Sequence, residues 1–259
     1  MDAGGSSKHF DAIHDEYAFF QQHSTEAEQD LRAHLPYLTS LAQSGPSIRL
    51  LDFGCGDGEF LGRLLAATEV PPPRLFLSLV EPDAGYLSQA RSRIRVFTTH
   101  PVSAWPSLPP ETPPRFDLIL VNHVFYYVTD LVGTLKRLLE ARAPEGRLLV
   151  SLAGRDNILS RIIDRSFASI REPAPYHFAE DLEKALASLR QPFRRRLLPY
   201  TMDFPDLESN RRMTARFLLG EHLSRMDWPH IMKLFDPYVK NGRVVIDTNH
   251  YHFVIAAAS

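Results

Sequence analysis

A chain of 259 residues is long enough for one large α/β domain or for two small ones. Its formal net charge of −2 excludes a strong general attraction to nucleic acid or to an anionic membrane. The single cysteine excludes an internal disulfide, and no apolar run reaches membrane-spanning length, so we expect a cytoplasmic protein.

The N-terminal segment 9–44 has the spacing of two helices. Apolar side chains at Phe10, Ile13, Tyr17 and Phe20 recur every three or four residues. A second helix is predicted over 27–41, after Ser24-Thr25-Glu26, with Ser24 as a candidate N-cap.

The most informative stretch is the glycine-rich loop at 54–58. An apolar strand over 48–53 precedes it, and a helix with Phe60 at its start follows. Glycines allow a ligand to approach the backbone closely, and a helix start offers free N–H groups. A dinucleotide fingerprint has glycine at its first, third and sixth positions, but here the sixth is Glu59.

The carboxylate of Asp52, two residues before the first glycine, suits a cationic group better than a pyrophosphate. The resulting D-x-G-x-G-x-G loop resembles motif I of class I S-adenosylmethionine (SAM) methyltransferases. A plain strand–turn–helix corner remains the alternative interpretation.

A second strand over 75–80 ends in Glu81-Pro82-Asp83, and Glu81 lies 23 residues after Gly58. An acid at the end of the second strand, about 20 residues after the glycines, hydrogen-bonds a ribose diol in nucleotide-binding folds. The alternative role of Glu81 is to stabilise the start of a helix through the helix dipole.

Further strands are predicted over 95–98, 116–121 and 147–151, with a helix over 131–141. The loop 99–105 is expected to face an adenine, with Ser103 as the contact. Strands that alternate with helices form a parallel, doubly wound sheet, which binds ligands outside the carboxyl ends of its strands. The glycine loop, Glu81 and Asn122-His123 all fall at that edge.

The C-terminal part carries a predicted helical substrate lid over 155–240, interrupted by prolines. Its Arg194-Arg195-Arg196 run is interpreted as a solvated strand or loop face. Two strands are predicted at 243–247 and 251–255. The whole chain, 1–259, is predicted to be one domain, with an N-terminal helical cap over 1–44, a cofactor-binding core over 45–154, the lid, and C-terminal strands over 241–259.

Eleven histidines raise the question of a metal site. The densest group is the pair His250 and His252 on one face of a predicted strand. One pair without a second cluster makes a weak site, so no metal is expected.

Longer motifs show a closer resemblance. The chain is similar to the histamine N-methyltransferase family in His23-Ser24-Thr25-Glu26 with its preceding aromatic, in Val80-Glu81-Pro82, in the Tyr-Tyr-Val-x-Asp run at 126–130, and in the last strands around Asn249. The resemblance runs nearly end to end. It implies a Rossmann-like class I methyltransferase sheet with helices on both faces.

The resemblance also implies roles for matched positions. Glu26 and Asn249 correspond to residues that contact the substrate. The expected walls of the amine pocket are Tyr17, Phe20, Tyr126 and Tyr127. Gly54, Glu81 and Asn122 match the family's cofactor positions. Together with the residues predicted from the loop and strand pattern, the expected cofactor-binding residues are Asp52, Gly54, Cys55, Gly56, Glu81, Pro82, Ser103 and Asn122. His123 replaces the family's glutamine, and motif I has the general form rather than the family's own.

The sequence therefore predicts a SAM-dependent enzyme that methylates a nitrogen of a small polar, cationic acceptor. Glu26 is expected to orient the acceptor, and His123 to accept a proton from it or hydrogen-bond it. Packing and capping roles are the alternatives for these residues. The other functions left open are an O- or S-methyltransferase and a non-catalytic SAM-binding protein. The expected partner is a small molecule, without nucleic acid or membrane, and the expected oligomeric state is a monomer.

Overall fold

The computed structural model describes residues 13–109 and 115–256. Within them one mixed sheet has the strand order β3-β2-β1-β4-β5-β8-β6, with the short β7 beside β8. The strands are β1 (Ile48–Phe53), β2 (Leu75–Val80), β3 (Ser103–Trp105), β4 (Phe116–Asn122), β5 (Arg142–Leu152), β6 (Arg194–Pro205), β7 (Val239–Lys240) and β8 (Arg243–Ile255). Strands β1 to β5 are parallel, while β8 runs antiparallel to both β5 and β6.

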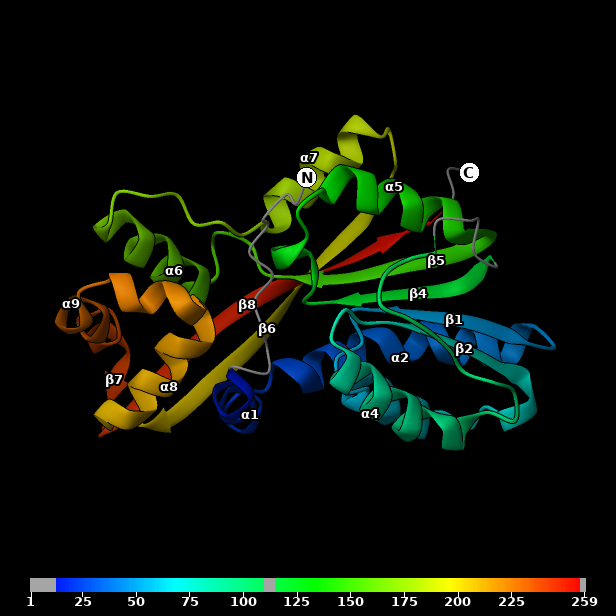
Figure 1. The fold of residues 1–259 in the computed structure, drawn as a ribbon, viewed down its shortest axis with the longest axis horizontal. Helices are drawn as coiled ribbons and strands as arrows, with labels where there is room; N and C mark the ends of the chain where they lie inside the picture. The colour runs from blue at the N-terminus through cyan, green and yellow to red at the C-terminus, as the bar shows by residue number, and fades with distance from the viewer. Residues whose placement is uncertain (1–12, 110–114, 257–259) are drawn as a thin grey trace.

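Helices cover both faces of this sheet. They are α1 (His14–His23), α2 (Glu26–Ser44), α3 (Glu59–Ala66), α4 (Ala84–Ile94), α5 (Leu131–Ala141), α6 (Ile158–Ser169), α7 (Ala179–Ser188), α8 (Glu208–Leu219) and α9 (Trp228–Lys233). Helices α5 and α7 lie on one face, and α2 and α4 on the other (Figure 1). None of the helices in the described ranges has both the length and the apolar character needed to cross a membrane.

Strand β4 shows why a parallel sheet forms here. Leu118 and Leu120 belong to the core under α2, α3 and α4, whereas Ile119 and Val121 belong to the core under α5 and α7. Since successive side chains of a strand point to opposite faces, an unbroken apolar run requires burial on both sides. The doubly wound α/β prediction is confirmed.

The two longest strands form a ribbon that extends beyond the rest of the sheet. Strand β8 pairs with β5 only over residues 251–255, but with β6 over residues 243–254. The outer part of the ribbon packs with α1, α6, α8 and α9 around a third apolar core (Figure 1). The ribbon leaves the sheet at His250, next to the carboxyl edge where the candidate site lies.

Several element predictions need correction. Residues 95–97 form a 3-10 turn instead of a strand, and the third strand is β3, which includes Ser103 itself. The region 155–240 is not helical throughout, because β6 crosses it and carries the exposed Arg194-Arg195-Arg196 run at the sheet edge. The two predicted C-terminal strands are one continuous strand, β8. Phe10 lies outside the described residues.

Candidate functional site

The glycine loop connects β1 to α3 through left-handed backbone conformations. Gly54 and Gly56 have φ values of 74° and 54°. A Cβ atom on Gly54 would lie 2.3 Å from the Val124 side chain, so the loop can pack this closely only with glycine. A Cβ on Gly56 would meet nothing within 4 Å, which leaves open space beside the loop backbone.

Glu81 connects the end of β2 to this loop. Its Oε2 accepts the Gly56 N–H at 3.0 Å, and its Oε1 accepts the Asp83 N–H at 3.1 Å. A carboxylate has about four acceptor positions, so it can still accept two hydroxyl hydrogens. Burial, only partly offset by these two bonds, raises the pKa of Glu81.

Asp52 lies at the end of β1 and is almost fully buried. Burial and the neighbouring Glu81 carboxylate raise its pKa to about 7. Two carboxyl groups beside a glycine loop favour a ligand that brings positive charge and hydroxyl groups, as the sulfonium and ribose of SAM do. The buried Oδ1 of Asn122, at the end of β4, also has no protein partner among the described residues. These features fit the predicted cofactor.

The other predicted cofactor residues differ in whether they are buried or exposed. Cys55 is buried inside the loop, and burial raises the pKa of its thiol, which suits packing. Pro82 is exposed after Glu81. Ser103 is exposed at the first residue of β3, whereas the carboxyl edge lies two residues further along, at Trp105. Their roles toward the cofactor stay predictions.

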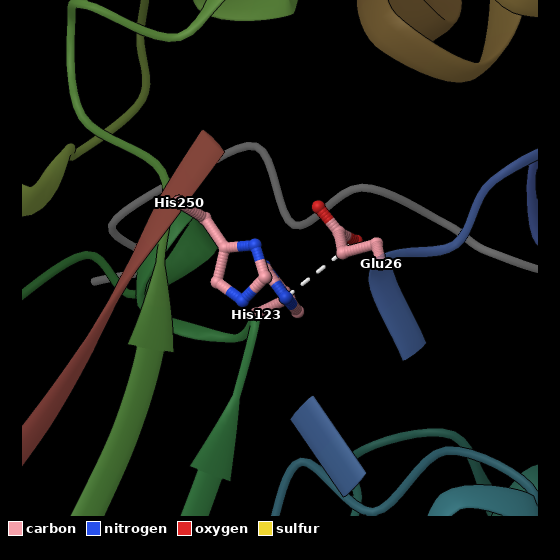
Figure 2. Close-up of side chains that lie close together, drawn as sticks. All are labelled: Glu26, His123 and His250. Carbon is pink, nitrogen blue, oxygen red and sulfur yellow. Dashed lines mark ion pairs between the residues drawn. The ribbon is translucent and has the colours of Figure 1, made fainter. Parts of the chain in front are cut away.

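A buried carboxylate organises the neighbouring polar cluster. Asp30, on α2, is fully buried. Its Oδ1 accepts hydrogen bonds from Ser151 Oγ and His250 Nε2, both at 2.7 Å, and its Oδ2 accepts one from His123 Nε2 at 2.9 Å. Glu26 lies one helical turn earlier, with Oε2 3.5 Å from His123 Nε2. Figure 2 shows Glu26, His123 and His250 converging from α2, the end of β4 and β8.

The charges in this cluster depend on one another. Burial alone would raise the pKa of Asp30, but His250 and His123 outweigh burial and hold it well below its usual range. Burial likewise opposes a charge on His123, but the Glu26 and Asp30 carboxylates raise its pKa to about 9. Near neutral pH, His123 is therefore an imidazolium between two carboxylates.

His123 is held in an unusual backbone conformation. Its φ of 57° is left-handed, which is uncommon for residues other than glycine and is often found at functional sites. Its Nδ1 lies 3.3 Å from the Tyr126 hydroxyl, which also accepts the Ala153 N–H at 2.6 Å. Both ring nitrogens therefore have protein partners, so direct proton transfer from an acceptor to His123 would require one of these bonds to break.

The structure brings only part of the predicted pocket together. Tyr126 and Tyr127 are adjacent, with ring centroids 5.7 Å apart, and the Tyr126 hydroxyl lies at the His123 nitrogen opposite the one that bonds Asp30. Phe20 packs inside the third apolar core, stacked on Phe217. Tyr17 contacts the same ring but also lies near the site, because burial and the nearby Glu26 carboxylate raise its pKa, and burial, with a smaller contribution from Tyr17, raises the pKa of Tyr127. Asn249 is half-buried beside His250, and its Oδ1 has no partner in the described part of the chain.

Asp30, Ser151 and His250 were not predicted as site residues. Asp30 lies four residues after Glu26, so helical spacing places both on one face and offers a signal. No local pattern connects Asp30 to Ser151 or His250, which are 121 and 220 residues away in the chain.

Behind the cluster lies a second buried histidine, His252. Both of its ring nitrogens lack partners among the described residues. Its ring contacts His34 and Tyr37 of α2, while Arg196 pairs with it across the sheet. Burial, with smaller contributions from His34 and Arg196, lowers the pKa of His252 to about 3.

This histidine is expected to make the fold sensitive to acid. Between pH 6.5 and 3 the unfolded chain binds a proton at His252 that the folded chain does not. The free energy of unfolding therefore decreases as the pH is lowered through this range. At pH 5 this lowers the free energy of unfolding by about 2 kcal/mol relative to pH 7. His252→Leu should remove that loss, as measured by urea unfolding at both values. The exposed control His230→Gln should keep it, and an unchanged pH dependence in His252→Leu would contradict the assignment.

Comparisons with known proteins agree with this geometry. A family model described as a methyltransferase domain matches residues 22–218. Histamine N-methyltransferase A of Xenopus laevis is 25% identical over 210 residues, covering 73% of this chain and 72% of that protein. Trans-aconitate 2-methyltransferase of Rhodopseudomonas palustris (strain BisB5) is 28% identical over 171 residues, covering 65% of this chain and 60% of that protein.

A solved structure supports the same architecture. The crystal structure of the plantazolicin methyltransferase BpumL, with a monoazolic desmethylPZN analog and SAH, has a TM-score of 0.56 at 12% identity. The match covers 98% of this chain and 95% of that one. The predicted Rossmann-like class I methyltransferase fold is confirmed.

Proposed function

We propose that this chain, which belongs to the methyltransferase-domain family, transfers the methyl group of SAM to a nitrogen of a small polar acceptor that carries a positive charge. The observation that supports this acceptor most strongly is the pair of carboxylates on α2. Asp30 already accepts hydrogen bonds from Ser151, His123 and His250, whereas Glu26 lies 3.5 Å from His123 Nε2. A cationic group beside Glu26 would therefore pair with the less engaged of the two carboxylates.

The cofactor assignment rests on the carboxyl edge of β1, β2 and β4. Glu81 would accept hydrogen bonds from the ribose hydroxyls, and the loop around Gly56 would let the nucleoside approach the backbone. Asn122 would provide a further polar contact. When bound, SAM supplies an electrophilic methyl group on a sulfonium.

The protein's contribution to the reaction would be mainly positioning. In-line transfer needs a neutral nitrogen whose lone pair points at the methyl group, and proximity and orientation supply much of the rate gain. Glu26 would hold a second, cationic part of the acceptor so that the nucleophilic nitrogen stays uncharged. The rings of Tyr126 and Tyr127 would exclude water and contact the cation through their faces.

The competing acceptor classes fit less well. A carboxylate acceptor, such as the one named for the trans-aconitate methyltransferase, would meet the Glu26 carboxylate as a like charge. A hydroxyl acceptor needs a base, and His123, the residue predicted for that role, is protonated near neutral pH with both its nitrogens hydrogen-bonded, which leaves His250 Nδ1 as the candidate base.

Glu26→Gln should raise the KM for the acceptor on the order of 10- to 100-fold, because a charge-assisted hydrogen bond contributes about 1.5–3 kcal/mol. The affinity for SAM, measured by calorimetry, should stay within about twofold of the original, since the carboxylate would contact the acceptor alone. Glu28→Gln is the matched control, because Glu28 is on the same helix but pairs with the surface residue Arg63. Normal acceptor KM in Glu26→Gln would contradict the role.

A further inference from the structure

His250 has one ring nitrogen whose hydrogen-bonding capacity the protein leaves unused. The residue is fully buried on β8, and its Nε2 donates to Asp30 Oδ1 at 2.7 Å. Its Nδ1 has no hydrogen-bond partner among the described residues. An unsatisfied buried polar atom destabilises a fold, so this nitrogen needs a partner that the described residues do not supply, such as a bound ligand or a water molecule.

The free nitrogen faces the candidate acceptor pocket. Figure 2 shows the His250 ring nitrogen next to its Cβ-bearing carbon, Nδ1, turned toward Glu26. Glu26, His123 and His250 each offer a nitrogen or oxygen atom within 4.8 Å of the others. When the His250 imidazole is neutral, its bond to Asp30 places the hydrogen on Nε2 and leaves a lone pair on Nδ1. The Tyr200 hydroxyl donates to the Glu26 carboxylate, and the Tyr200 ring lies 5.5 Å from the ring of His250, but no donor of the described residues reaches His250 Nδ1.

We propose that Glu26 and His250 form a binding site with two hydrogen-bond acceptors, which holds an N–H-bearing cationic group of the methyl-accepting substrate. This inference rests on the proposed function and extends it to the chemical class of the bound group. A primary ammonium, guanidinium, amidinium or imidazolium can donate one N–H to each acceptor. With hydrogen bonds of about 2.8–3.0 Å, two acceptors that share one such nitrogen lie on the order of 4.5–5 Å apart.

The charges and bonds of His123 favour an organic cation over a metal ion. A metal would need the lone pairs of both histidines. His123 Nε2 donates to Asp30, its Nδ1 is 3.3 Å from the Tyr126 hydroxyl, and the ring is protonated near neutral pH. Asp30 is then a positioning residue, because it fixes the His250 ring with Nδ1 toward the pocket.

His250→Gln tests most directly whether His250 Nδ1 accepts a hydrogen bond from the cation. The glutamine amide retains an N–H donor for Asp30 but has no acceptor at the Nδ1 position. The probes are benzylammonium and benzyltrimethylammonium, which share their charge and aromatic ring and differ in whether the nitrogen carries hydrogens. Their dissociation constants would be measured by ligand-observed NMR on the full chain with SAH. His252→Leu is the matched control, since His252 is also a buried histidine on β8 and has no contact with Glu26 in the described structure.

The expected result is a loss of affinity for only one of the two probes. His250→Gln should weaken benzylammonium binding on the order of tenfold and leave benzyltrimethylammonium unchanged, while His252→Leu should change neither. Equal effects on the two probes, or no effect, would overturn the proposal. So would one equivalent of tightly bound metal in the original protein that is lost in His250→Gln.

The two proposals can fail separately. If Glu26→Gln weakens the binding of benzylammonium but His250→Gln does not, the role of His250 is wrong and the amine site at Glu26 stands. If neither change affects either probe, both assignments are wrong.

Discussion

Replacing Asp30 with alanine is expected to lower the free energy of unfolding by about 3–5 kcal/mol, the range found when one partner of a buried charge pair is removed. The change would leave the His123 imidazolium, the Ser151 hydroxyl and the His250 Nε2–H without their shared acceptor. Urea unfolding at pH 7, followed by circular dichroism, measures the loss.

Two further variants separate charge from packing. Asp30→Asn keeps the side chain's shape but removes the carboxylate that raises the pKa of His123, so an NMR titration should show that pKa fall below about 9. Lys184→Ala breaks an exposed ion pair with Asp181 and should change stability by less than about 0.5 kcal/mol. If Asp30→Ala lowers the free energy of unfolding no more than Lys184→Ala does, the assignment of Asp30 as the shared acceptor of the cluster is wrong.

Glu81→Ala is expected to weaken SAM binding on the order of 10- to 100-fold, because hydrogen bonds to a charged group contribute about 1.5–3 kcal/mol each. Calorimetric titration with SAM and with SAH measures the change directly. The two compounds should be affected alike, since they share the ribose that Glu81 is proposed to hold.

The effect must be distinguished from damage to the loop, because Glu81 also accepts the Gly56 and Asp83 N–H groups. Glu81→Gln keeps one acceptor oxygen, which can still bond the Gly56 N–H, but loses the charge and the acceptor for the Asp83 N–H. It should therefore preserve the loop better than Glu81→Ala and still bind SAM more weakly. Glu59→Ala removes an exposed acid from the same loop–helix junction and should leave affinity within about twofold. Unchanged SAM affinity in Glu81→Ala would refute the ribose contact.

The sequence predicted the parts of the fold whose signal is local. The strands β1, β2 and β4 and the helix α5 are unbroken apolar or periodic runs, and they were placed within one residue of their ends. The third strand was placed wrongly because Val96 has strand-forming character but is 74% exposed in a turn. The actual strand β3 has only three residues, too few to show a period.

The candidate site likewise contains residues that the sequence predicted and residues that it did not. The glycine loop and Glu81 follow from short motifs, and their placement needs only the order of the strands. Glu26, at the start of α2, was assigned through the family resemblance. The cluster around Asp30 depends on β8 returning beside β5, which places His250 against a residue near the N-terminus. That pairing is a property of the assembled sheet, and an apolar strand does not specify its neighbour.

The central claim is methyl transfer to nitrogen, and SAM with a ¹³C-labelled methyl group tests it directly. The protein would be incubated with the labelled SAM and a panel that contains histamine, other imidazole amines, guanidino compounds, amino acids and phenols. Products would be analysed by mass spectrometry and carbon-correlated NMR, which distinguishes N-, O- and S-methyl groups. The account predicts a labelled N-methyl product from a cationic acceptor that is strongly reduced in Glu26→Gln. A labelled methyl group found only on oxygen or sulfur would contradict it.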